Sequence, residues 1–173
     1  AIVAAMAEQV GTDLSRLHNE VNKLDVAMGA ERNLTPAHVE RHIGISKDYN
    51  NFELVAAIAT RDVAKAFKIV HFFSKNPKEH PVQMITGILF NFVNNLIQYH
   101  SLKGQNEKQI ATALKVHPYF LKQFSVAARH YSAAHAHNML EELLVFDRKC
   151  KGVIRSSSGE YEHLREWLIR CTL

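Results

Sequence analysis

The spacing of hydrophobic positions predicts helices along the chain, most clearly in residues 51–73, NFELVAAIATRDVAKAFKIVHFF. Apolar residues recur there every three or four positions. Asn51 is predicted as the N-cap of a first helix, and Thr60 as the start of a second. The two apolar faces would consist of Phe52, Val55, Ile58 and Ala59, and of Val63, Ala66, Phe67, Val70 and Phe73. Two adjacent apolar faces predict a helical hairpin packed into one core.

Residues 82–102 form a long segment without Asp, Glu, Lys or Arg, and we predict a central helix of a bundle there. One side is apolar, with Ile85, Leu89, Phe92, Leu96 and Tyr99. The other side carries carboxamides, namely Gln83, Asn91, Asn94, Asn95 and Gln98. A membrane span is disfavoured because these amides would enter hydrocarbon. Since a solvated helix face usually carries charge, the amides are candidates for a subunit interface, and a plain solvated face is the alternative.

Start and stop signals divide the chain into about nine helical segments, without a competing strand pattern. Gly11, Gly29 and Gly44 end three segments at the N-terminus, and Thr35 and Pro36 open the third of them. We therefore predict a three-helix unit in residues 1–44. A linker and a second helical unit would follow in residues 45–173. Its later helices are predicted at residues 107–114, 118–130, 133–151 and 158–171.

Composition supports an all-α protein and changes this picture little. Of the 173 residues, 47% are apolar and 22% charged, and seven Gly and four Pro leave little room for long irregular segments. The net charge of +4 suggests an acidic or nucleic-acid partner without identifying one. Cys150 and Cys171 are expected to be reduced thiols of a cytoplasmic protein. Because the first residue is Ala1 and an apolar run begins at once, we expect a fragment that starts inside a helix.

No pattern of residues predicts catalysis, a cofactor or a metal. The seven glycines fit neither a P-loop nor a dinucleotide-binding turn. His38 and His42 have the i, i+4 spacing of metal ligands, but a surface pair is the preferred interpretation because no HExxH motif surrounds them. His135 and His137 would lie on different helix faces. No Ser, Cys or Asp belongs to a recognised nucleophile motif with a histidine.

Residues 109–129, QIATALKVHPYFLKQFSVAAR, have the spacing of a helix-turn-helix. The turn glycine is missing, and the prominent residues of the second helix are apolar, whereas a reading helix exposes base-contacting side chains. Lys122, Gln123 and Arg129 would contact phosphates at best. Packing into the core is therefore the preferred interpretation, and a free-standing DNA-binding module is the alternative function.

The densest basic cluster contains Arg148, Lys149 and Lys151, with Arg155 close behind. Cations at the C-terminus of a helix interact favourably with the helix dipole, which explains three of them without a ligand. The four residues are also candidates for contacts with a DNA backbone. Such contacts would be insensitive to sequence and weakened by salt.

The order of motifs resembles the delta subunit of the bacterial DNA polymerase III clamp loader over almost the whole chain. Residues 17–24, LHNEVNKL, and Leu34-Thr35-Pro36 opening a short helix resemble the lid of that subunit. Residues 52–62, the uncharged helix, Val116-His117-Pro118 and Asp147 resemble its C-terminal collar.

This resemblance implies a partial three-helix AAA+ lid at residues 1–44, followed by a collar of about six to seven helices. It implies a part of the subunit without a catalytic site, within the DNA polymerase III holoenzyme, which helps to load the sliding clamp onto primed DNA. The collar would bind the other clamp-loader subunits. The sliding clamp would be bound by a domain preceding Ala1, so no clamp-binding residue can be assigned here.

Overall fold

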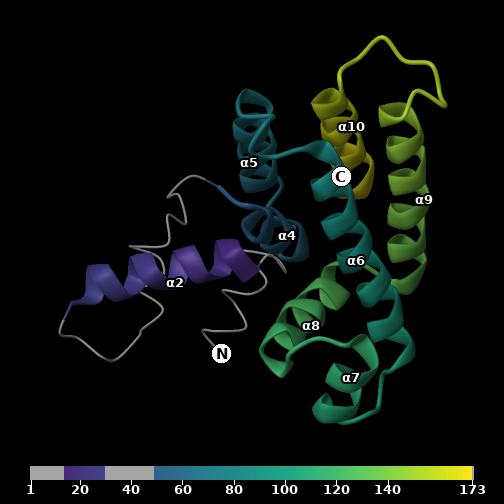
Figure 1. Cartoon of the computed structure of the whole chain (residues 1–173). Helices are drawn as coiled ribbons and strands as arrows, with labels where there is room; N and C mark the ends of the chain where they lie inside the picture. The colour runs from purple at the N-terminus through teal and green to yellow at the C-terminus, as the bar shows by residue number, and fades with distance from the viewer. Residues whose placement is uncertain (1–13, 30–48, 173) are drawn as a thin grey trace. The chain divides into compact units, whose positions relative to one another are not determined.

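The computed structural model describes residues 14–29 and 49–172, and every regular element in them is helical (Figure 1). The contacts divide the chain into two units, residues 1–48 and residues 49–173. The described elements are α2 (Leu14–Met28), α4 (Asn51–Ala59), α5 (Val63–Lys75), α6 (Val82–Ser101), α7 (Glu107–Leu114), the 3-10 helix η1 (Pro118–Phe120), α8 (Leu121–His130), α9 (Ala133–Cys150) and α10 (Glu160–Thr172). The predicted all-α class is confirmed for these residues.

In the first unit the described part is α2, which ends at Met28, directly before the predicted stop at Gly29. Gly29 has a φ of +54°, a left-handed conformation that glycine adopts without a steric penalty. The helices predicted at residues 1–10 and 37–43, with His38 and His42, lie outside the described residues. The division into a lid at residues 1–44 and a collar at 45–173 therefore stays a prediction.

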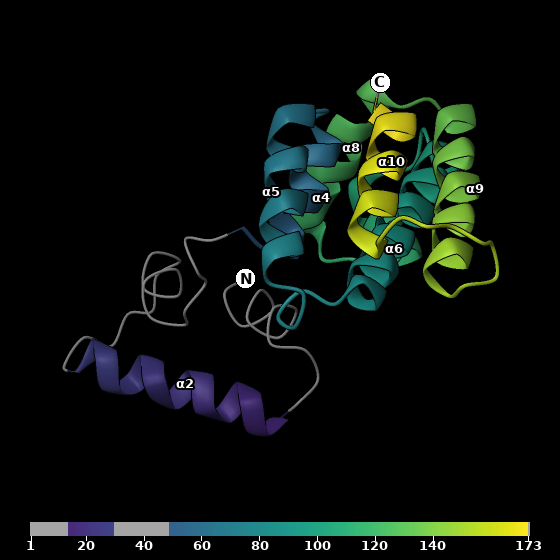
Figure 2. The same ribbon diagram turned by 90° about the horizontal axis from the view of Figure 1, so that it is seen from above.

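The second unit buries one hydrophobic core between seven α-helices. Figures 1 and 2 show α10 lying between α5 and α9, and α6 packs against both α9 and α8. Trp167 of α10 is buried in the middle, where its indole Nε1 donates to the Met139 carbonyl of α9 at 3.2 Å. Among the described residues, no helix is long and apolar enough to span a membrane, α6 included.

The corner between α4 and α5 differs from the sequence prediction in its capping residues. Asn50, not Asn51, is the N-cap of α4, and its side chain accepts from the Glu53 backbone N–H at 2.9 Å. Thr60 does not begin α5, because its hydroxyl bonds back to the Ala56 carbonyl at 2.9 Å and closes α4. Asp62 caps α5 instead, by accepting from the Lys65 backbone N–H. Each helix has two residues nearby that could cap it, Asn50 and Asn51 for α4 and Thr60 and Asp62 for α5, so the sequence does not decide between them.

The buried faces follow the predicted helical period with some corrections. Phe52 is 37% exposed, whereas Leu54 is buried, so the apolar face of α4 is rotated from the predicted one. Val63 and Phe67 of α5 are only half-buried, while Ile69, Val70 and Phe73 are buried. On α6, Ile85, Leu89, Phe92 and Leu96 are buried as predicted. Tyr99, the last residue of the predicted apolar side, is half-buried.

Hydrogen bonds tie the helix ends together around Tyr131, which lies between α8 and α9. The buried Tyr131 hydroxyl donates to the Ile58 carbonyl in the last turn of α4 at 2.7 Å. The Tyr131 carbonyl accepts from His100 Nε2, near the end of α6, at 2.8 Å. Burial raises the pKa of Tyr131 to about 12, so the hydroxyl stays protonated and can donate at neutral pH.

The C-terminal end of α10 is held at the same end of the domain. Arg61 has a φ of 56°, and its Nε donates to the Thr172 carbonyl at 2.9 Å. His135 Nε2, in the first turn of α9, donates to the Cys171 carbonyl at 2.8 Å. These two bonds satisfy carbonyls that the end of a helix leaves without an intrahelical donor.

We predict that Tyr131→Phe lowers the free energy of unfolding of the chain by about 1 kcal/mol, because it removes one buried hydrogen bond without changing the ring. The loss stays moderate since the Ile58 carbonyl also accepts from the Arg61 backbone N–H at 2.9 Å. Tyr119→Phe is the matched control, because Tyr119 is 76% exposed. Urea unfolding measures both. Equal effects of the two substitutions would contradict the role given to Tyr131.

Candidate functional site

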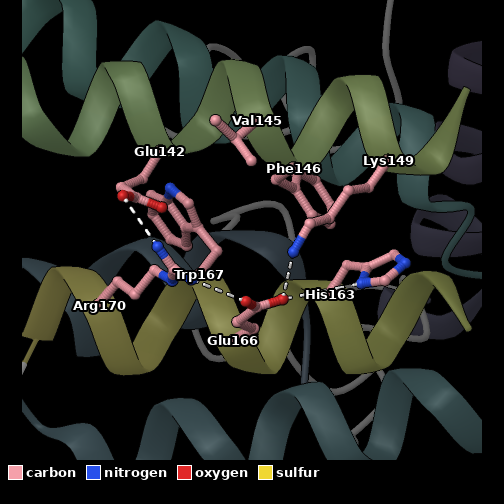
Figure 3. Close-up of a pocket in the computed structure, with 8 residues that line it drawn as sticks. All are labelled: Glu142, Val145, Phe146, Lys149, His163, Glu166, Trp167 and Arg170. Carbon is pink, nitrogen blue, oxygen red and sulfur yellow. Dashed lines mark hydrogen bonds and ion pairs between the residues drawn. The ribbon is translucent and has the colours of Figure 1, made fainter. Parts of the chain in front are cut away.

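The densest group of charged side chains lies between α9 and α10 (Figure 3). The Glu166 carboxylate accepts from Lys149 Nζ at 2.6 Å and from Arg170 Nη2 at 3.0 Å. Arg170 Nη1 also reaches the Glu142 carboxylate at 3.3 Å, and His163 Nδ1 lies 3.9 Å from Glu166. The pocket lined by these residues has a volume of about 10 Å³, which holds about one water molecule. The group therefore joins two helices around a space of about one water molecule.

The electrostatics of this group are those of a partly exposed ion-pair network. The hydrogen bond from Lys149 holds the pKa of Glu166 below its ordinary value, and Arg170 adds to the effect. The Glu142 carboxylate raises the pKa of Arg170. Because the Glu166 side chain is 39% exposed, water screens the charges, and the Lys149–Glu166 pair stabilises the fold by at most about 1 kcal/mol.

Ion pairs involve two of the four basic residues that the sequence predicts as contacts with a DNA backbone. Lys149 is paired with Glu166, and Lys151 Nζ is paired with Asp147 of the same helix at 2.7 Å. Arg148 and Arg155 are exposed, and no ion pair involves either within the described part of the chain. The contact with a DNA backbone stays a prediction. Lys151 is exposed as well, and the two arginines are the exposed members without an ion pair among the described residues.

The carboxamide side of α6 is largely accessible, but one amide has a partner. Gln83 Nε2 donates to a Glu160 carboxylate oxygen at 3.4 Å. Asn91 and Gln98 are exposed, and Asn94 and Asn95 are half-buried. Met84 and Phe90 project from the same side of the helix and are 52% and 48% exposed. We call this surface the α6 face, and its members are Gln83, Met84, Gly87, Phe90, Asn91, Asn94, Asn95 and Gln98.

The segment that resembled a helix-turn-helix packs against the core. Leu121, Phe124 and Ala127 of α8 are buried, and the Phe124 ring stacks on Phe92 with centroids 5.9 Å apart. Lys115, where the motif would have its turn glycine, adopts a left-handed φ of 54°. These observations agree with the preferred interpretation of a core-packing segment.

The histidines of α9 lie apart, as their spacing predicted. His135 is half-buried against the Cys171 carbonyl, whereas His137 is exposed and its Nδ1 bonds to the Ala133 carbonyl at 2.8 Å. Within residues 14–29 and 49–172, no group of three or more His, Cys, Asp or Glu residues is placed to hold a metal ion. Cys171 is buried, Cys150 is half-buried, and both thiols are free.

One pocket was missed by sequence reasoning. It has a volume of about 600 Å³ and lies between α5 and α10 beside the residues that precede α4. Its lining is Tyr49, Phe67, Lys68, His71, Phe72, Lys75 and Arg165. A partial signal exists in the sequence, because α5 contains four basic residues and no acidic one. Nothing in the sequence places Arg165 beside them.

We predict that Glu166→Gln lowers the free energy of unfolding at pH 7 by about 0.5–1 kcal/mol, because it removes a partly exposed, ion-paired carboxylate. The folded-state pKa of Glu166 lies below its ordinary 4.5, so the stabilisation is present above that pH and is lost as pH falls. Urea unfolding at pH 7 and pH 3 should show the difference from wild type shrinking at pH 3. Glu141→Gln, at an exposed position of α9, is the control and should have little effect at either pH.

Three comparisons with known proteins agree. The family model described as DNA polymerase III delta subunit, C-terminal domain, matches residues 48–168. The DNA polymerase III subunit delta of Bacillus subtilis (strain 168) is 30% identical over 144 residues, which are 82% of this chain and 41% of that protein. The solved structure of the Bacillus subtilis DNA clamp loader delta protein (YqeN) matches with a TM-score of 0.69 and 26% identity, covering 97% of this chain and 49% of that chain.

This chain thus spans less than half the length of both relatives. The match to the family model covers more than half of this chain and falls on the helical unit that begins at Tyr49. The all-helical fold and the ordered resemblance of the sequence point to the same group of proteins. The chain belongs to the family of the DNA polymerase III delta subunit, C-terminal domain.

Proposed function

We propose that this chain is the assembly-forming part of a clamp-loader delta subunit. In this proposal the helical unit is the collar that binds the other clamp-loader subunits, and residues 1–44 are the lid. The whole assembly loads a sliding clamp onto primed DNA in the DNA polymerase III holoenzyme. The contact with the clamp would be made by a part of the subunit outside this chain. Family membership and the likeness to the Bacillus subtilis clamp loader delta protein support the proposal.

The observation that carries the assembly role is the uncharged α6 face. α6 contains no Asp, Glu, Lys or Arg, yet it exposes Met84 and Phe90 among its amides. The centres of protein interfaces are poor in charged residues and rich in aromatic residues and Met. Amide side chains there can hydrogen-bond across the interface without the cost of burying an unpaired charge. We therefore place the contact with a neighbouring subunit on this face.

The role proposed for this part is non-catalytic. Its support is the chemistry of the site, because the charged group between α9 and α10 is engaged in ion pairs around a space of about 10 Å³. The ion pairs of Lys149 with Glu166 and of Arg170 with Glu142 and Glu166 hold α9 and α10 together, which is a structural use of these charges. An association role instead needs exposed apolar and amide side chains, which the α6 face provides.

We predict that Phe90→Glu weakens co-assembly of this chain with the other subunits of its clamp loader by about tenfold or more, because it puts a charge into an interface that has none. Size-exclusion chromatography and a titration of the mixed subunits measure the effect. The control is Val153→Glu, since Val153 is 71% exposed in the loop between α9 and α10. Thermal unfolding should show both variants folded. Unchanged assembly of a folded Phe90→Glu variant would contradict the placement of the interface.

A further inference from the structure

The pocket between α5 and α10 combines aromatic rings with positive charge. Tyr49, Phe67 and Phe72 are half-buried, whereas Lys68 and Lys75 are exposed. The rings therefore form the deeper part of the lining, and the ammonium groups lie nearer the solvent. A volume of about 600 Å³ is within the range of pockets that bind a large side chain or a small ligand.

The positive charges of this pocket come from both helices that line it, α5 and α10. Lys68, His71 and Lys75 have i, i+3 and i+7 spacing and share one side of α5. Among the described residues, neither lysine takes part in an ion pair. Arg165 of α10 is held in place, because its Nη2 donates to Ser74 Oγ at 3.2 Å and lies 3.4 Å from His71 Nδ1. Its Nη1 pairs with Glu162, a carboxylate that is 58% exposed beside the pocket.

The arrangement of the rings favours one kind of occupant over another. The Tyr49 and Phe72 rings meet edge to face, with centroids 6.0 Å apart and an interplanar angle of 77°. Such rings form a hollow and not the flat platform on which nucleobases stack. A hollow with a cationic rim suits a bulky apolar side chain whose sequence neighbours are acidic.

Charge also argues against one segment of this chain as the occupant. Residues 30–48 contain three acidic residues, Glu31, Glu40 and Asp48, and three basic residues, Arg32, Arg41 and Lys47. Without a net negative charge, this segment has no electrostatic complementarity to the pocket. A separate acidic segment does.

We propose that this pocket binds an acidic peptide segment of a partner protein. One bulky apolar side chain of the peptide enters the hollow formed by Tyr49, Phe67 and Phe72. Carboxylates on either side of it pair with Lys68 and Lys75 at the rim. This site goes beyond the proposed assembly role, because it lies on α5 and α10 and shares no residue with the α6 face.

The test uses the full 173-residue chain and a short fluorescein-labelled peptide, in which two aspartates flank a central phenylalanine on each side. Fluorescence anisotropy should show saturable binding. The double variant Lys68→Glu and Lys75→Glu should weaken it by about tenfold or more. A peptide with glycine in place of phenylalanine should bind about tenfold more weakly, a change that carries no risk to the fold. Lys108→Glu with Lys122→Glu makes the same charge change at exposed positions of α7 and α8 and should leave binding unchanged.

Several results would overturn the proposal. They are the absence of saturable binding, an equal loss in the Lys108 and Lys122 control, and no effect of removing the phenylalanine. Tighter binding of a labelled oligothymidylate at the same lysines would assign the pocket to single-stranded nucleic acid. Self-association of the wild-type chain that the Lys68 and Lys75 variant abolishes in sedimentation would assign it to a second copy. Co-assembly of that variant with the clamp-loader subunits should persist, so failure here is separable from failure of the assembly role.

Discussion

The arrangement of the helices depends on one shared hydrophobic core, whose helix ends are oriented by the buried hydrogen bond from Tyr131 to the Ile58 carbonyl. This bond joins the junction of α8 and α9 to the last turn of α4. The Tyr131 carbonyl receives His100 from α6, and the carbonyls at the end of α10 receive Arg61 and His135. Five helix ends are thereby fixed at one end of the domain by polar contacts. The sides of α5 and α6 are not part of these contacts, and they form the pocket and the α6 face.

Charge is distributed unevenly over these surfaces, and the distribution separates their roles. Between α9 and α10, cations and carboxylates neutralise one another and join the two helices. α6 presents a face without charge, which suits association with another protein. α5 presents cations without acidic residues of its own, beside a hollow of aromatic rings. The charge of each surface depends on which of its charged residues form ion pairs within the fold.

Most of the helices of residues 49–172 could be predicted from the sequence, because amphipathic period and breakers act locally. The start of α6 after Pro81 was predicted from the proline, and most of its apolar side was predicted from the spacing of its hydrophobic residues. Capping at the α4–α5 corner was predicted wrongly, since Asn50 and Asn51, and Thr60 and Asp62, are competing caps whose choice depends on hydrogen bonds. The rotation of the α4 face, which exposes Phe52, depends on packing against α5, α6 and α8.

The candidate surfaces were less predictable, because they depend on residues far apart in the sequence. Lys149, a predicted DNA contact, is paired with Glu166, and the sequence does not predict that ion pair. Arg165 lies in the pocket of Lys68 and Phe72 because α10 packs against α5, and the sequence gives no signal of that pairing. The sequence shows that one side of α6 carries amides in place of charges. It does not show that Gln83 contacts Glu160 or that Met84 and Phe90 are exposed beside the amides.

We propose that the α6 face is covered when this chain assembles with clamp-loader subunits. Hydroxyl-radical footprinting of the chain, alone and mixed with those subunits, tests this directly, since oxidation reports the exposure of single side chains. We expect Met84 and Phe90 to become protected in the mixture, while the exposed Tyr119 stays as reactive as in the free chain. Equal oxidation of Met84 and Phe90 in an assembled complex would contradict it.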